Sequence, residues 1–210
     1  MKVLLAGAHG AVGEHLIRAL HARGHEVTAG VRDADQFPEM KADGAEPVML
    51  DLTTPEQFDA ALSGADAVIF AAGSKGQALE DVDRDGAKAL ADHARQTGTD
   101  RFVMLSSIMA DRPEEGPEKL QPYLHAKHEA DEHLKQSGLD WTIVRPGGLT
   151  DDAPTGQIRT GQGFEGEDAV IPRADVAETL AVALGDPGTI GKTFEIISGD
   201  VVIEEALKEV

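Results

Sequence analysis

The chain has 210 residues, the size of one domain, and it contains no cysteine, which excludes disulfides, thiolate nucleophiles and cysteine-ligated zinc. Its 19 basic and 38 acidic residues give a formal net charge of −19, and the basic residues are scattered along the chain. We therefore expect neither nucleic acid nor membrane as a partner. The apolar run before Gly7 is too short for a signal sequence or a membrane span, so we expect a cytoplasmic protein.

Short aliphatic runs alternate with longer amphipathic segments along the whole chain. The aliphatic runs predict seven strands, at residues 2–6, 26–31, 46–50, 67–71, 101–106, 141–145 and 193–197. The amphipathic segments predict helices, each with a glycine at or near its end, at residues 11–23, 55–62, 79–97, 119–137 and 174–184. This alternation is typical of parallel strands joined by crossover helices.

The predicted strands are continuous apolar runs, as expected when helices cover both faces of a sheet. We predict an α/β fold with a doubly wound, mostly parallel, seven-stranded sheet, which is a Rossmann fold. It forms one domain over residues 1–210, with a small C-terminal substrate cap. Two long stretches, 109–118 and 147–171, are predicted to be irregular and to frame the functional site, with 147–171 on the substrate side.

A glycine-rich turn follows the first predicted strand and opens the first predicted helix. Such a turn needs the freedom of glycine, and a diphosphate can approach a backbone without Cβ atoms at a helix N-terminus. The alternative is a tight turn that holds no ligand. We predict a bound dinucleotide, with the diphosphate at Gly7, His9, Gly10, Ala11, Val12 and Gly13.

The G-x-x-G-x-x-G spacing of this turn resembles that of extended and atypical short-chain dehydrogenase/reductases. The resemblance spans nearly the whole chain and is closest to NmrA-like, biliverdin-reductase-like and epimerase/dehydratase-like NAD(P)-binding proteins. Its most specific block is SGLDWTIVRPGGLT at residues 137–150, with weaker signals at 51–52, 71–73 and 172–177. The resemblance implies cofactor contacts beyond the turn, at Asp51, Leu52, Ala71, Ala72, Gly73, Ser106, Lys127, Pro146, Gly147 and Gly148.

The residue that ends the second predicted strand indicates which nicotinamide cofactor binds. NAD-binding domains place a carboxylate there to accept from the ribose 2′-hydroxyl, whereas this chain has Arg32. A guanidinium suits a 2′-phosphate, so we predict NADP in preference to NAD. The alternative is that Arg32 pairs with Asp33 or Asp35 on the surface.

Tyr123 and Lys127 lie four residues apart on a predicted helix, so their side chains share one face. A tyrosine can protonate the oxygen of a carbonyl that accepts hydride, and a neighbouring ammonium stabilises its phenolate. The alternative is a structural ion pair between Lys127 and Asp131. The resemblance adds Ser107 as the residue that orients the substrate. Adjacent serines at a strand end also commonly cap helices or turns.

The resemblance further implies that Asp83 takes the place of the asparagine usual in the superfamily's catalytic set. Asp83 is predicted either to hold the ammonium of Lys127 or to serve as a structural anchor. No metal is expected, because His125, His128 and His133 do not share one helix face.

Together these features predict an NADP(H)-dependent oxidoreductase or epimerase-like enzyme acting on a small carbonyl, quinone or flavin-like substrate. Few residues follow Gly148, which indicates a small or half-enclosed substrate. The rival interpretation is a non-catalytic, NADPH-sensing regulatory protein of the NmrA-like type, which would act on a protein partner.

Overall fold

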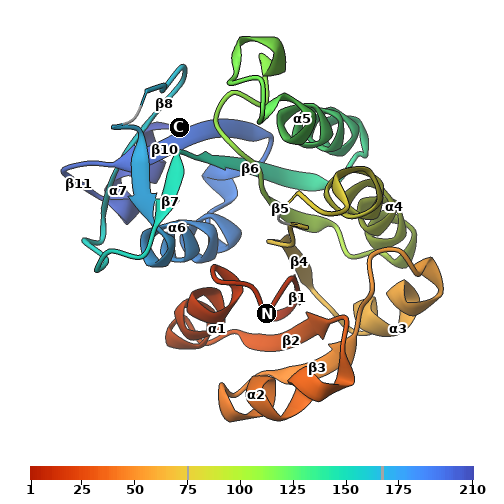
Figure 1. The fold of residues 1–210 in the computed structure, drawn as a ribbon. Coiled ribbons are helices and arrows are strands. Elements are labelled where there is room, and N and C mark those ends of the chain that lie inside the picture. Colours follow the sequence, from red (N-terminus) through yellow and green to blue (C-terminus); the bar gives the residue numbers. More distant parts are fainter. Residues whose placement is uncertain (75, 167) are drawn as a thin grey trace.

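The computed structural model describes residues 1–74, 76–166 and 168–210, which form an α/β domain around one large sheet (Figure 1). Nine strands follow the order β11-β8-β10-β6-β5-β4-β1-β2-β3. Seven are parallel: β1 (Lys2–Ala6), β2 (Glu26–Val31), β3 (Glu46–Met49), β4 (Ala67–Phe70), β5 (Arg101–Leu105), β6 (Asp140–Pro146) and β10 (Lys192–Ser198). All seven predicted strands are therefore confirmed, within two residues at each end.

Two further strands, β8 (Gln157–Gly161) and β11 (Val201–Val202), extend the sheet in antiparallel fashion beyond β10. A separate two-stranded sheet joins β7 (Gly148–Thr150) to β9 (Val170–Pro172). The prediction of seven strands and of an irregular 147–171 segment was wrong here. These strands are two to five residues long, and in β8 only Ile158 is buried, so they lack the apolar run that identified the others.

Helices cover both faces of the sheet. One layer contains α1 (Gly13–Ala22) and α6 (Arg173–Gly185), and the other contains α3 (Phe58–Leu62), α4 (Ala87–Thr97) and α5 (Gln121–Gln136), as Figure 1 shows. A π-helical segment, Leu79–Gly86, leads into α4. Two short helices, α2 (Phe37–Ala42) and α7 (Ile203–Ala206), were not predicted. Single 3₁₀ turns occupy Ala34–Gln36, Pro55–Gln57, Pro113–Glu115, Pro187–Thr189 and Leu207–Glu209.

Alternate residues of each central strand enter opposite core layers. Leu5 and Ile69 pack in the cluster beneath α1 and α6, whereas Leu4 and Val68 pack beneath α3 and α4. All four side chains are fully buried. The continuous apolar runs thus reflect burial on both faces, as the sequence predicted. Within the described ranges, no helix has the length and apolar character needed to cross a membrane.

Candidate functional site

The carboxyl ends of the parallel strands lie at one edge of the sheet, and the winding of the chain reverses there between β1 and β4. In open α/β sheets, ligands bind in the crevice at such a switch point. The predicted cofactor residues end or closely follow strands β1 to β6, at 7–13, 32, 51–52, 71–73, 106 and 146–148. The fold therefore brings them to one edge, although they come from six separate parts of the chain.

The glycine-rich turn is packed tightly against the end of β4. Gly7 has φ +89°, and a Cβ on it would lie 2.6 Å from the Cα of Ala72. A Cβ on Gly13 would lie 2.5 Å from the carbonyl oxygen of Ala8. A Cβ on Gly10, in contrast, would meet only the Gly7 carbonyl oxygen, at 3.1 Å. Packing in the turn thus demands glycine strongly at positions 7 and 13, and less strongly at position 10, where one contact is tight.

The first turn of α1 offers backbone donors at this place. Val12 is the N-cap, and its side chain makes no capping hydrogen bond. Ala11 before it is exposed. Unpaired N–H groups at a helix N-terminus, together with the helix dipole, attract an anion. The glycine-rich turn, in which Gly10 makes fewer close contacts than Gly7 and Gly13, and the uncapped helix start thus fit the diphosphate of a dinucleotide.

Arg32 is exposed at the end of β2, and within the described residues it forms no ion pair. The alternative of a pair with Asp33 or Asp35 is not observed. Asp33 instead accepts from the backbone N–H of Asp35 at 2.9 Å and caps the 3₁₀ turn.

The side chain of His9 turns from the glycine-rich turn toward α2. Its Nε2 lies 2.9 Å from the Glu39 carboxylate, and its Nδ1 lies 3.0 Å from the Gln36 amide nitrogen. Both nitrogens of the imidazole therefore contact side chains of the protein, and the part of His9 that remains available to a diphosphate is its backbone.

The residues after β3 and β4 lie at the same edge of the sheet. Asp51 accepts from both the N–H and the hydroxyl of Thr53, at 2.9 and 2.7 Å. Leu52 is buried, and its Cβ would lie 2.8 Å from a Cβ on Gly86. Ala71 and Ala72 are half-buried, and Gly73 is exposed. Because these side chains are small, the backbone at the end of β4 can lie close to the glycine-rich turn.

Lys127 is almost fully buried on α5, with its ammonium pointing at the end of β5. Its Nζ donates to the carbonyl oxygen of Leu105 at 3.2 Å and lies 3.8 Å from Oδ1 of Asp83. The Nζ also lies 5.8 Å from the ring centroid of half-buried Tyr123, so the predicted shared face is observed. The partner of Lys127 is thus Asp83, and the alternative pair with Asp131 is not observed in the described chain.

Asp83 is 1% exposed and comes from the π-helical segment. Its Oδ2 accepts from the N–H of Ser74 at 3.0 Å. Its Oδ1 and the hydroxyl of Ser74 are buried without a hydrogen-bond partner among the described residues. Asp83 therefore anchors the chain after β4 and holds the Lys127 ammonium, which unites the two predicted alternatives.

The two serines after β5 differ in what their side chains do. The hydroxyl of Ser106 donates to buried Asp131 at 2.8 Å, so this hydroxyl is engaged within the protein, and the contact of Ser106 with the cofactor stays a prediction. Ser107 is half-buried, and no side-chain hydrogen bond is found for it in the described part of the protein. Neither hydroxyl caps a helix there, so Ser107 is the one available to a ligand.

A buried ion pair supports Ser106, and the sequence analysis missed it. Arg145 contacts Asp131 through Nε at 3.0 Å and through Nη2 at 2.9 Å. Burial raises the pKa of the Asp131 carboxyl, while the guanidinium of Arg145 and the hydroxyl of Ser106 act in the opposite direction. Asp131 was considered only as a partner of Lys127. A charged residue at the carboxyl end of the apolar run of β6 was the available signal for Arg145.

The chain after β6 passes close to residue 169. A Cβ on Gly147 would lie 2.8 Å from the carbonyl carbon of Ala169, so this position requires glycine. Pro146 ends β6, and exposed Gly148 starts β7. The chain after β6 therefore leads directly into the two-stranded sheet of β7 and β9.

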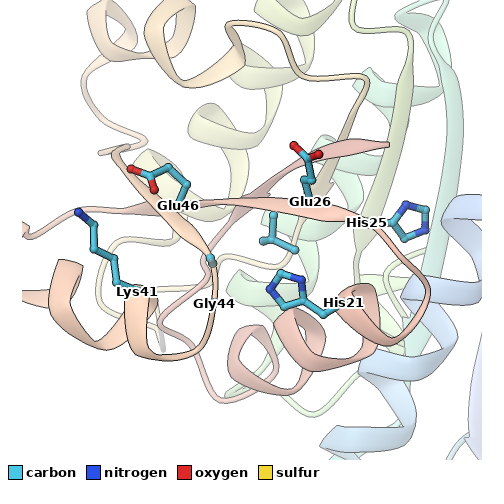
Figure 2. Close-up of a pocket in the computed structure, with 8 residues that line it drawn as sticks. His21, His25, Glu26, Lys41, Gly44 and Glu46 are labelled. Atoms are coloured by element: carbon cyan, nitrogen blue, oxygen red, sulfur yellow. The ribbon is translucent and has the colours of Figure 1, made fainter.

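A cavity of about 350 Å³ lies far from this edge, at the amino ends of β2 and β3. His21, His25, Glu26, Lys41 and Glu46 line it, and Figure 2 shows the two carboxylates pointing away from the imidazoles. No group of three or more metal-ligating side chains occurs in the described ranges, here or elsewhere. This cavity has no converging polar groups, and the site remains at the carboxyl edge.

Comparison with known proteins is consistent with this site. A family model described as NAD(P)H-binding matches residues 7–187. An uncharacterized sugar epimerase of Bacillus subtilis (strain 168), YhfK, is 40% identical over 215 residues that span 100% of both chains. A proposed NAD-dependent epimerase/dehydratase from Bacillus halodurans, with a solved structure, is 38% identical, with 100% of both chains covered and a TM-score of 0.95. ChuY, an anaerobillin reductase from Escherichia coli O157:H7, is 26% identical, with a TM-score of 0.83 over 96% of this chain and 98% of that one.

Proposed function

Because this chain belongs to the NAD(P)H-binding family, we propose that it is an NADPH-dependent oxidoreductase of the atypical short-chain dehydrogenase/reductase type. Its substrate is a small carbonyl, quinone or flavin-like molecule. The observation that carries the binding part of this proposal is Gly10, where a Cβ would meet one backbone atom at 3.1 Å, whereas at Gly7 and Gly13 it would meet several at shorter distances. Among the described residues, the hydroxyl of Ser74 and Oδ1 of Asp83 have no hydrogen-bond partner at the same edge, which also fits a ligand that supplies hydrogen bonds.

The preference for NADPH rests on Arg32. Its guanidinium is exposed, unpaired among the described residues and placed at the end of β2, where a 2′-phosphate would accept two hydrogen bonds. Arg32→Ala should weaken NADPH binding at least tenfold and leave NADH binding within twofold. The matched control is Arg18→Ala, which removes another exposed arginine, from α1. Unchanged discrimination between the two cofactors in Arg32→Ala would remove this assignment.

The proposed chemistry places the proton at the hydroxyl of Tyr123. When bound, the reduced nicotinamide supplies a hydride to the substrate carbon, and Tyr123 gives its proton to the substrate oxygen. The ammonium of Lys127, 5.8 Å from the ring centroid of Tyr123, favours the phenolate that remains. Asp83 holds that ammonium in place, and Ser107 donates to the substrate oxygen.

The test is NADPH consumption with a panel of quinones, flavins and small carbonyls. Tyr123→Phe should lower the turnover number at least a hundredfold while the dissociation constant for NADPH stays within twofold, because the aromatic ring remains and only the hydroxyl that donates the proton is lost. Equal turnover in the wild type and the variant would exclude Tyr123 as the acid. If the wild type binds NADPH but oxidises none of it with any acceptor of the panel, the sensing role is supported instead.

A further inference from the structure

Glu195 is a fully buried carboxylate in the middle of β10. Its neighbours along the strand, Phe194 and Ile196, enter the core beneath α1 and α6, so Glu195 faces the opposite side of the sheet. In register it stands between Arg145 on β6 and Gly161 on β8. A buried charge is costly, and an apolar side chain would suit an ordinary core position better.

The carboxylate of Glu195 joins two separate segments of the chain. Its Oε2 accepts from the backbone N–H of Phe164 at 2.7 Å. Its Oε1 lies 3.7 Å from Nη1 of Arg112, and no hydrogen-bond partner for it occurs in the described ranges. Phe164 belongs to the turn after β8, and Arg112 belongs to the segment that follows Ser107.

Local contacts or backbone strain constrain both segments. A Cβ on Gly161 would lie 2.8 Å from Cζ of Phe164, so the ring rests on the glycine. The guanidinium of Arg159 lies 4.9 Å from the centroid of the same ring. In the other segment, Met109 is the one non-glycine residue of the described chain with positive φ, at 65°. A strained residue two positions after Ser107 persists only where its surroundings hold it.

A chain of charges connects Glu195 to the candidate catalytic residues. Arg112 lies 3.1 Å from Asp111, and Asp111 lies 3.6 Å from Arg145. Arg145 pairs with Asp131, which accepts from Ser106, the residue before Ser107. Asp131 is also on α5, the helix that carries Tyr123 and Lys127.

We propose that Glu195 is a positioning residue for the substrate side of the site, because it holds the segment 107–116 through Arg112 and the turn 161–166 through the Phe164 amide. This proposal rests on the proposed oxidoreductase function only for its kinetic consequence. The physical coupling between the two segments is independent of that function.

The first test is hydrogen–deuterium exchange of the backbone amides in 108–116 and 162–166, with NADPH bound and without it. Glu195→Gln keeps an acceptor for the Phe164 amide but removes the charge that faces Arg112, so exchange in 108–116 should rise at least fivefold. Arg112→Gln should raise exchange at least threefold in 162–166, which Arg112 does not itself touch. The matched control, Glu178→Gln, removes a carboxylate that pairs with Arg23 between α1 and α6, and it should leave both segments unchanged.

The second test is steady-state kinetics with NADPH and menadione. Glu195→Gln and Arg112→Gln should each raise the KM for menadione about tenfold while the dissociation constant for NADPH stays within twofold. The double variant should be no worse than either single one, because both remove the same connection. If Glu195 had a purely structural role, the variants would lose stability, and the KM for menadione would not rise separately from the dissociation constant for NADPH.

Unchanged exchange of 162–166 in Arg112→Gln overturns the proposal, whatever the enzyme does with menadione. If Glu195→Gln does not fold, Arg112→Gln decides by itself, since Arg112 is partly exposed. Wild-type protein that consumes no NADPH with any acceptor refutes the oxidoreductase function, and the exchange result still decides on Glu195.

Discussion

Substitution of alanine at two glycines of the same turn separates the demands of the fold from those of the ligand. Gly13→Ala places a Cβ 2.5 Å from the Ala8 carbonyl oxygen and 2.7 Å from the Ala8 carbonyl carbon. Both neighbours are backbone atoms, so the turn must move by several tenths of an ångström. Gly10→Ala places a Cβ near one atom only, the Gly7 carbonyl oxygen at 3.1 Å.

The magnitudes follow from these contacts. Overpacking of this kind costs about 1–3 kcal/mol. In a chain of this length, each kcal/mol shifts Tm by about 2–4 °C, so Gly13→Ala should lower Tm by about 2–12 °C. Gly10→Ala meets a single tight contact, and the lower entropy of its unfolded chain returns about 0.4–1 kcal/mol, so its Tm should stay within about 2 °C. Its methyl group nevertheless occupies the approach of a diphosphate, and NADPH affinity should fall at least tenfold, or about 1.4 kcal/mol.

Thermal unfolding followed by circular dichroism, without ligand, measures the first effect, and calorimetry with NADPH measures the second. Gly185→Ala is the control, because a Cβ there meets nothing within 4 Å and its φ is not positive. The reasoning is refuted if Gly10→Ala binds NADPH as well as the wild type does. It is also refuted if Gly10→Ala lowers Tm as much as Gly13→Ala.

Three further outcomes are expected. Asp131→Ala leaves the buried guanidinium of Arg145 with exposed Asp111, at 3.6 Å, as its remaining carboxylate. It should lower the free energy of unfolding by about 3–5 kcal/mol in urea denaturation, and a loss below about 1 kcal/mol would contradict the pairing. Burial, followed by the positive charges of the Met1 amino group and Arg23, lowers the pKa of His25 from 6.5. At pH values near 6.5 the unfolded chain therefore binds a proton at His25 more readily than the folded protein does. The contribution of His25 to stability is full above pH 6.5 and is lost as pH falls from 6.5 through the lowered pKa. His25→Gln should flatten the dependence of Tm on pH over this range. If Tm depends on pH equally in the wild type and in His25→Gln, the predicted effect of the lowered pKa is refuted. With a net charge of −19, Tm should rise between 0.05 and 1 M NaCl as the Debye length falls to about 3 Å, and a constant Tm would show that self-repulsion is negligible.

Local sequence patterns accounted for the elements whose signal lies in the segment itself. Strands such as β1 and β4 are buried on both faces, so their apolar runs mark them without knowledge of their neighbours. The spacing of Tyr123 and Lys127 likewise placed both on one helix face. The short strands β8 and β11 have no such signal, because pairing with β10 at the sheet edge, and not their own hydrophobicity, makes them strands.

The sequence by itself determined the parallel sheet, the glycine-rich turn at its carboxyl edge and the family to which the chain belongs. Only the tertiary structure decided how the charged side chains are paired. Lys127 and Asp83 are 44 positions apart, and Glu195 meets Arg112 across 83 positions. A charge in the sequence can find many partners in a chain with 38 acidic residues, and only burial in a specific fold, where an unpaired charge is costly, selects one of them.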